Sequence, residues 1–282
     1  MFSFNTFSQK EFKKYSLWST RGKVSILLNQ TGFSDWVGGG TNNFSGTIKF
    51  DYEWEYEDRG WNWLTNVESA YGLAKYKNAP FARKIDDRIL IQSIIGKEFT
   101  KNLSFSAFFN FTSQIGNGYK YSKDSENNEI RDLTTKIFSP AYFQLGSGFL
   151  WKKDERLWLN YSPIASRLIL VSKKFTNDLS VGETYFGVLP DKSSRYELGA
   201  NITFHSEGNL LENVKYKQDL KLFSNYLESA SNIDLDYLVQ IDVDVNPILS
   251  TQLIIQLIYD DNAISRLQVR EVFGVGVQLK LD

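Results

Sequence analysis

The sequence predicts an all-β protein that forms a single antiparallel transmembrane β-barrel of about 12 strands. Three observations predict this fold. Apolar and polar residues alternate with a period of two along most of the chain, the alternating runs are long for a soluble sheet, and short links between runs alternate with long ones. A period of two is the side-chain period of a strand whose two faces lie in different environments.

Composition excludes several other classes of protein. The 282 residues include 32 Lys and Arg against 33 Asp and Glu, a net charge of −1, and the two signs are interspersed. The chain therefore lacks the basic surface of a nucleic-acid binder, and we expect no nucleic-acid partner. Without cysteine, and with a single histidine, thiolate or multi-histidine metal sites are excluded, so we expect no metal and no cofactor.

The twelve alternating runs are the predicted strands. The clearest spans residues 233–245, where the odd positions are apolar and the even ones polar or acidic except Leu238. Each run has about 12 to 17 residues, whereas strands of soluble sheets have about 5 to 6 and membrane-spanning strands about 9 to 11 within the lipid. The runs cover residues 23–36, 44–57, 61–76, 84–99, 103–115, 138–152, 155–171, 195–206, 213–226, 233–245, 249–260 and 267–281.

The links between runs differ in length on the two sides of the predicted sheet. Tight links follow runs two, four, six and ten. Long links of about 22 and 23 residues follow runs five and seven. Only the eighth link, 207–212, is intermediate in length and departs from this alternation. Outer-membrane barrels have short periplasmic turns and longer external loops. We therefore expect a periplasmic lead-in over residues 1–20 and an outer-membrane barrel over 21–282. The first ten residues lack the layout of a secretory signal, so the protein is either cytoplasmic or exported with a signal that has been removed. The barrel pattern favours the outer membrane.

Tryptophans gather at the short-link end. Their amphipathic rings suit the headgroup boundary, where outer-membrane barrels carry aromatic girdles. Trp18 precedes the first predicted strand, and the predicted girdle consists of Trp54, Trp61, Trp63, Trp151 and Trp158.

The main alternative fold is a soluble β-sandwich or a lipocalin-like binding barrel. Strands of these folds also alternate, but their apolar face points inward. The length of the runs and the asymmetry of the links favour the membrane barrel.

A set of short motifs is spread along the chain: Leu28–Trp36, Gly38–Gly40, Asn43, Ala70–Leu73, Asp86–Arg88, Ser139–Tyr142, Leu222–Tyr226, Asn232–Asp234 and Glu271–Gly276. Together these motifs resemble a Bacteroidota family known only as a domain of unknown function. The resemblance covers residues 18–281 and implies an outer-membrane β-barrel exported with a cleaved signal, with no assigned activity. The chain departs from such barrels at its end, because Leu279-Lys280-Leu281-Asp282 lacks a terminal aromatic residue.

If the apolar face meets lipid, the polar face lines the lumen. Pairing Tyr226 with Ile233 places Lys217 opposite Asp242 and Lys215 opposite Asp244, so opposite charges face each other. Such a ladder either fills the barrel or forms an ion-selective constriction. The predicted lumen-lining residues are Lys49, Asp51, Glu53, Lys84, Asp86, Arg88, Lys215, Lys217, Lys221, Asp242, Asp244 and Arg270.

Twelve strands with long charged residues inside predict a narrow or blocked pore, because eight strands enclose only side chains and sixteen leave an aqueous channel. Gly274 and Gly276 fall on the predicted inner face, where they leave room for a folded-in loop.

An enzyme is the remaining alternative, since some twelve-stranded barrels modify outer-membrane lipids. Such an enzyme needs a serine within reach of a histidine base. The single histidine, His205, precedes Ser206, and adjacent residues of a strand point to opposite faces. We therefore predict no catalytic residues and a non-enzymatic role, either as a narrow or plugged channel or as an accessory subunit of an outer-membrane assembly. The predicted partners are outer-membrane lipid and other envelope proteins.

Overall fold

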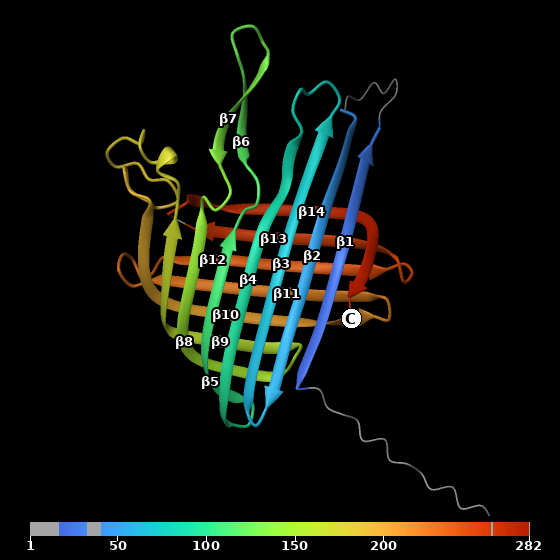
Figure 1. The fold of residues 1–282 in the computed structure, drawn as a ribbon, viewed down its shortest axis with the longest axis vertical. Helices are drawn as coiled ribbons and strands as arrows, with labels where there is room; N and C mark the ends of the chain where they lie inside the picture. The colour runs from blue at the N-terminus through green and yellow to red at the C-terminus, as the bar shows by residue number, and fades with distance from the viewer. Residues whose placement is uncertain (1–16, 33–40, 261, 282) are drawn as a thin grey trace, which may run out of the picture.

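The computed structural model describes residues 17–32, 41–260 and 262–281. Twelve long strands in these ranges form a closed antiparallel barrel, in the order β1-β14-β13-β12-β11-β10-β9-β8-β5-β4-β3-β2. The strands of the near wall cross those of the far wall (Figure 1). The predicted fold class and strand number are confirmed. The barrel strands are β1 Trp18–Thr31, β2 Asn43–Asp58, β3 Trp61–Tyr76, β4 Arg83–Thr100, β5 Leu103–Ser113, β8 Ala141–Asp154, β9 Leu157–Leu170, β10 Ser194–Leu211, β11 Val214–Asn225, β12 Ile233–Asp244, β13 Leu249–Asp260 and β14 Ile264–Leu281.

Each predicted run corresponds to one barrel strand. The bounds of β3 and β13 agree with the runs 61–76 and 249–260. β1 begins at Trp18, within the expected lead-in, so this residue opens a strand instead of preceding it. Residues 1–16 of the lead-in lie outside the described residues, and the periplasmic placement of the lead-in stays a prediction.

The apolar faces of the strands point outward and the polar faces point inward. Outward-facing Ile48, Phe105 and Ile164 are 58%, 56% and 64% exposed, whereas Asn160 and Glu197 are 0% and 1% exposed. A soluble barrel or sandwich has the reverse arrangement, because its apolar side chains are removed from water. The outward apolar surface therefore identifies a barrel that spans a membrane, and the soluble alternative is excluded.

Turn geometry explains the tight links at one end. Arg59 and Gly60 connect β2 to β3 with φ of 48° and 76°, the positive values that a two-residue hairpin turn needs to match the twist of its strands. The eighth link, predicted over residues 207–212, is also short in the structure, because β10 continues to Leu211 and leaves only residues 212–213 before β11. Five links at this end, which we call the short-turn end, have two to four residues.

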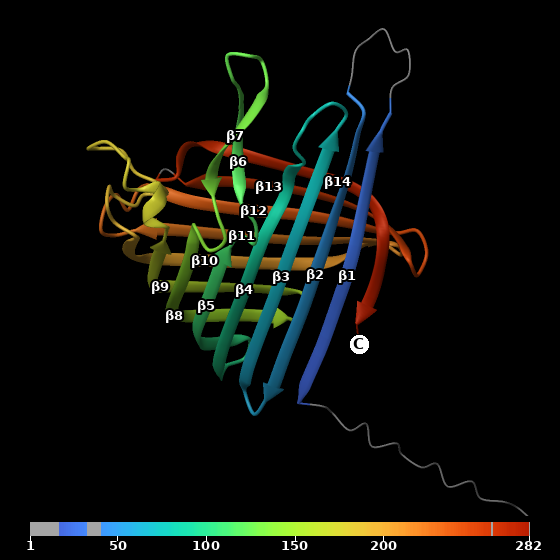
Figure 2. The ribbon, with the colours of Figure 1, turned by 45° about the horizontal axis from the view of Figure 1, so that its top comes forward.

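The opposite, long-loop end carries most of the irregular structure. β6 (Gly118–Lys123) and β7 (Glu129–Thr135) form a hairpin that stands out from the barrel (Figures 1 and 2). The β9–β10 loop, with the 3-10 helix η1 (Lys173–Phe175), packs beside it, and the Tyr185 hydroxyl donates to Thr134 O at 2.5 Å. Burial raises the pKa of Tyr185 to about 12. No helix in the described ranges is long and apolar enough to cross a membrane.

Pairing of β1 with β14 closes the barrel, from Gly22 opposite Leu281 to Leu28 opposite Val275. The predicted space for a loop beside Gly274 and Gly276 is not found. A Cβ at Gly276 would lie 2.1 Å from Ile26 O, and one at Gly274 would lie 3.2 Å from the Leu27 Cβ. These glycines therefore serve the close approach of the two strands at the seam.

Candidate functional site

The inside of the barrel is the candidate functional site. Ion pairs and hydrogen bonds, which we call the cross-lumen network, join opposite walls in its middle and toward the short-turn end. An apolar cluster fills part of one wall, and a cavity lies at the long-loop end. The network consists of Arg21, Lys23, Glu53, Glu68, Arg88, His205, Glu207, Lys217, Asp219 and Asp242.

Glu68 is the centre of the network. Its Oε1 accepts from Lys217 Nζ at 2.6 Å and its Oε2 accepts from Arg88 at 3.0 Å. β3, which carries Glu68, and β11, which carries Lys217, are six strands apart in either direction around the ring of twelve. The Lys217–Glu68 pair thus spans the full width of the lumen.

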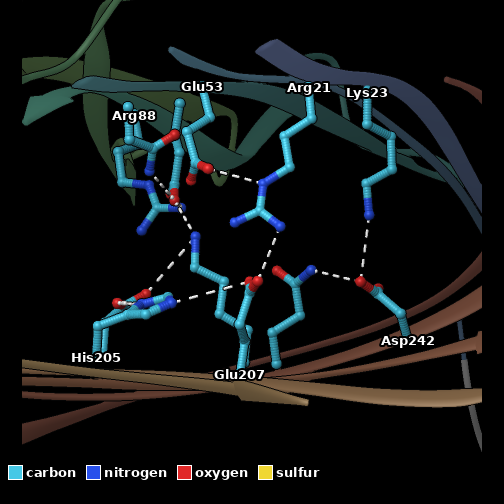
Figure 3. Close-up of polar contacts among 12 residues, drawn as sticks. Arg21, Lys23, Glu53, Arg88, His205, Glu207 and Asp242 are labelled. Carbon is cyan, nitrogen blue, oxygen red and sulfur yellow. Dashed lines mark hydrogen bonds and ion pairs between the residues drawn. The ribbon is translucent and has the colours of Figure 1, made fainter. Parts of the chain in front are cut away.

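Two further pairs cross the lumen beside it. Arg21 on β1 contacts Glu53 on the neighbouring strand at 2.7 Å and Glu207 on β10 at 3.0 Å. Lys23 reaches Asp242 on β12 at 3.2 Å. Figure 3 shows Arg21, Lys23 and Glu53 extending from one wall to meet Glu207 and Asp242 from the other. These contacts join side chains from opposite walls; Lys23 and Asp242 are 23% and 18% exposed, whereas Arg21 is 52% exposed.

Other predicted lumen residues also reach across the barrel. Lys49 Nζ on β2 donates to Gln252 Oε1 on β13 at 2.5 Å, and Arg270 on β14 contacts Asp86 on β4 at 2.5 Å. Asp51 lies opposite Lys23 in the β1–β2 register. The ammonium of Lys221 has no such contact in the described part of the chain.

The predicted pairing of β11 with β12 is wrong by two residues. Ser224, not Tyr226, lies opposite Ile233, so Lys215 faces Asp242 and Lys217 faces Gln240. Ser224 Oγ donates to Ala230 O within the connecting loop, which places the first pair of the hairpin at Ser224. A shift of two keeps every side chain on its predicted face.

Both lysines still find carboxylates after the shift. Lys215 Nζ contacts Asp244 Oδ2 diagonally at 2.8 Å, and Asp244 Oδ1 also accepts from Gln278. Lys217 turns to Glu68 across the lumen. The ladder predicted between two neighbouring strands is therefore replaced, at Lys217, by a contact between opposite walls.

A β-bulge interrupts the predicted alternation at Lys84. The β3–β4 register shifts between Gly72 and Leu73, so Asp86 lies opposite Gly72 and Lys84 opposite Leu73. Lys84 Nζ contacts Asp87 Oδ2 at 2.5 Å, close to the long-loop end. Lys84 therefore lies at the mouth of the lumen and not in line with Asp86 and Arg88.

Trp158 does not belong to the predicted girdle. It is 7% exposed and its ring stacks on His205 inside the barrel, with 5.2 Å between centroids. Its even-numbered neighbours Asn160 and Ser162 are fully buried on the same face, which the sequence could have indicated. The interior apolar cluster that contains Trp158 also contains Leu64, Ile94, Phe108, Leu150, Ala165 and Phe223.

The other predicted girdle tryptophans lie on the outer surface. Trp54, Trp61, Trp63 and Trp151 are between 36% and 45% exposed, and Trp18 packs against Tyr56 and Trp63 with centroid distances of 5.0 and 5.7 Å. All five are at or near the short-turn ends of their strands. This position is where an aromatic girdle meets the headgroups.

A cavity of about 600 Å³ opens at the long-loop end, and we call it the vestibule. Its lining comes from the ends of the strands at that side, from Lys84 and Asp86 on β4 to Arg270 on β14, and from Phe186 in the β9–β10 loop. Two smaller cavities in the described interior hold about 20 and 30 Å³, which is space for roughly one water each. Glu68, Arg88 and Asp219, three members of the cross-lumen network, line the cavity of about 30 Å³, so the network lies next to the vestibule.

The surroundings of His205 do not support serine chemistry. Its Nδ1 lies 2.7 Å from Asp219 Oδ1 and its Nε2 lies 3.8 Å from Glu207. Ser206 faces away and contacts the Tyr216 hydroxyl at 3.2 Å. No serine hydroxyl hydrogen-bonds His205 in the part of the chain that the structure describes, and no group of three or more potential ligands for a metal ion occurs there.

Six members of the network are absent from the predicted lumen-lining residues: Arg21, Lys23, Glu68, Glu207, His205 and Asp219. The first two precede or open the predicted first run, and Glu207 was placed in a link. Glu68 shares its face with Asn66 and Ala70, so its inward direction could have been read from the period of two. Its contact with Lys217, six strands away, has no signal in the sequence.

A family model described as "Protein of unknown function (DUF3078)" matches residues 28–119. The match supports the predicted likeness to a domain of unknown function, while the taxonomic group stays a prediction. No curated protein matches the chain.

Solved structures of similar shape have little sequence in common with the chain. The translocator domain of the autotransporter NalP from Neisseria meningitidis is 9% identical, with a TM-score of 0.43, and the match covers 95% of this chain and 89% of that one. An outer membrane channel from Pseudomonas putida F1 is 10% identical, with a TM-score of 0.39 and coverage of 98% and 99%. The toluene transporter TodX from Pseudomonas putida is 9% identical, with a TM-score of 0.33 and coverage of 93% and 87%.

The strands themselves define the class of protein. A closed antiparallel barrel with an even number of strands, short turns at one end, long loops at the other and an apolar outer surface is the architecture of outer-membrane proteins.

Proposed function

We propose that this chain is a plugged outer-membrane channel, a barrel whose pathway is closed in this state by side chains that meet across the lumen. The short-turn end faces the periplasm and the long-loop end faces the exterior. The proposed role is non-enzymatic, because no serine hydroxyl among the described residues hydrogen-bonds His205, and the neighbouring Ser206 pairs with Tyr216.

The Lys217–Glu68 pair is the observation that carries this proposal. Two side chains from diametrically opposite strands make contact at 2.6 Å, and Arg88 adds a second cation to the same carboxylate. A passage wide enough for hydrated solutes cannot coexist with this contact. Separation of these groups is therefore the step that opens the pathway.

Conductance in planar bilayers tests the proposal. The wild-type protein gives no large steps, whereas the triple variant Glu68→Ala/Arg88→Ala/Lys217→Ala, which removes the bridge, gives discrete steps. The matched control is Lys215→Ala/Asp244→Ala, which removes an ion pair between neighbouring strands that does not cross the lumen. The control, like the wild-type protein, gives no large conductance steps.

Each other outcome contradicts the proposal in a different way. Large steps from the wild-type protein show that the lumen is not plugged. Absence of steps from a folded triple variant shows that separation of Lys217 from Glu68 does not open the pathway, and it overturns the proposal at its central pair, because Arg21–Glu207 and Lys23–Asp242 still cross the lumen. The accessory role in an envelope assembly then remains, and co-purified partners from native membrane are its direct test.

A further inference from the structure

The vestibule contains one cation whose charge the protein does not neutralise by contact. Five cationic side chains line it, and four of them are paired. The paired ones are Lys84 with Asp87 at 2.5 Å, Arg88 with Glu68 at 3.0 Å, Arg167 with Asp234 at 2.6 Å and Arg270 with Asp86 at 2.5 Å. The fifth is Lys221 on β11.

Lys221 is half-buried, and its position leaves its ammonium without a partner. Among the described residues it makes neither an ion pair nor a hydrogen bond. Asp236 lies opposite Lys221 in the β11–β12 register, yet its Oδ1 accepts from Gln256 Nε2 at 2.7 Å. Lys221 lines both the vestibule and the small cavity of about 30 Å³ beneath it, so its side chain lies at the vestibule floor.

A half-buried ammonium without an acceptor is a favourable position for an anion. Hydrogen bonds that involve an ionised group are stronger than neutral ones, and partial exclusion of water increases the attraction. Each of the five carboxylates that line the vestibule already has a partner: Asp86, Asp87 and Asp234 contact cations, Asp236 accepts from Gln256, and Asp260 accepts from the backbone N–H groups of Asn262 and Ala263. The position therefore favours an incoming anion over an incoming cation.

The walls above Lys221 supply apolar surface. Tyr142 and Phe186 line the vestibule and belong to a packed group with Ile169, Val171 and Val188, which fixes the wall there. Ile258 and Tyr259 line it from β13. A volume of about 600 Å³ lies within the range of about 300 to 1,000 Å³ typical of small-molecule sites.

We propose that the vestibule binds a small organic anion, whose carboxylate or phosphate contacts Lys221 and whose apolar body packs against Tyr142 and Phe186. This site goes beyond the channel proposal and does not depend on it, because a ligand can occupy the vestibule whether or not the floor below it opens.

Calorimetric titration of the purified full chain in detergent tests the site with four soluble probes that share one ring: benzoate, phenyl phosphate, benzylamine and benzyl alcohol. Benzoate or phenyl phosphate binds measurably, and the preference between them identifies carboxylate or phosphate as the recognised group. Benzylamine and benzyl alcohol bind at least tenfold more weakly.

Variants locate the binding. Lys221→Met weakens binding of the preferred anion at least tenfold. Lys221→Arg, which keeps the charge, retains most of the affinity. Lys84→Met is the matched control, because Lys84 lines the same vestibule but is occupied by Asp87; it changes affinity less than threefold. Circular dichroism and the mobility of the folded barrel in electrophoresis confirm that each variant is folded.

Three results overturn the proposal: no binding of either anion to the wild-type protein, equal affinity in Lys221→Met, or stronger binding of benzylamine than of benzoate. None of these readouts involves conductance, so failure of the anion site and failure of the plugged channel are distinguishable.

Discussion

Lys217 and Glu68 form an ion pair between opposite walls of the barrel, with 2.6 Å between Nζ and Oε1. Their side chains are 26% and 9% exposed, and Arg88 and Asn66 also donate to the Glu68 carboxylate. A glutamate with three donors is well compensated inside a lumen, where an unpaired charge is costly. This one side chain links three strands, β3, β4 and β11.

Removal of one partner should destabilise the barrel. Lys217→Met leaves Glu68 with Arg88 as its only cation, and we expect the free energy of unfolding to fall by about 3 kcal/mol, the lower end for a broken buried pair. Urea unfolding in lipid vesicles measures the loss.

A double variant measures the interaction between Lys217 and Glu68 separately from the effect of losing each side chain. Glu68→Gln/Lys217→Met should lose less than the sum of the two single variants, because neither charge is left unpaired. Losses that add contradict a direct interaction between the two residues. Lys215→Met, whose lysine is more exposed and pairs within one hairpin, serves as the control and should lose less than about 1 kcal/mol.

The tryptophans divide into an outer and an inner group, and lipid quenching distinguishes them. In vesicles with brominated acyl chains, the fluorescence of Trp63 and Trp151 should be quenched, whereas that of Trp158, which stacks on His205, should not. The residual unquenched emission should therefore decrease in Trp158→Phe and remain unchanged in Trp151→Phe. The opposite pattern would place Trp158 in the girdle.

Glu155, in the turn between β8 and β9, should make stability fall with rising pH. The neighbouring Glu55 carboxylate, together with partial burial, raises the pKa of Glu155 above its usual 4.5. The folded state therefore binds this proton more tightly than the unfolded state, so the stabilisation is complete below pH 4.5 and is lost as pH rises through the higher folded pKa.

Melting temperatures between pH 4 and 8 measure this dependence. Glu155→Gln should melt at a higher temperature than wild type at pH 7 and should lack the part of the decline that begins at pH 4.5. Glu57→Gln, at the same end of the barrel, should retain the decline. A Glu155→Gln profile that parallels wild type would contradict this assignment.

The sequence could predict features that depend on period and length, and not those that depend on contacts between distant strands. Strand number, and the bounds of β3 and β13, follow from local alternation. The register of β11 on β12 could not be predicted, because two registers that differ by two residues place every side chain on the same face and alternation does not distinguish them.

The candidate site shows the same division. The inward direction of Asp242 and Arg270 follows from alternation, but their partners, Lys23 and Asp86, come from strands three and four positions away around the ring. The bulge at Ile85 on β4, which takes Lys84 out of line with Asp86, has no composition signal. The close contact between Gly276 and Ile26 also has no signal in the sequence, because it arises only where β1 pairs with β14 to close the barrel.

Spin labels test most directly which faces of the strands meet lipid. The chain has no cysteine, so single cysteines at Val239 and Gln240, adjacent residues of β12, give one label each without further changes. In vesicles, the label at residue 239 should collide strongly with oxygen, which concentrates in the bilayer, and weakly with a water-soluble nickel complex. The label at residue 240 should show low oxygen accessibility. Higher oxygen accessibility at 240 than at 239 would contradict the outward apolar face, and with it the lumen and the plug.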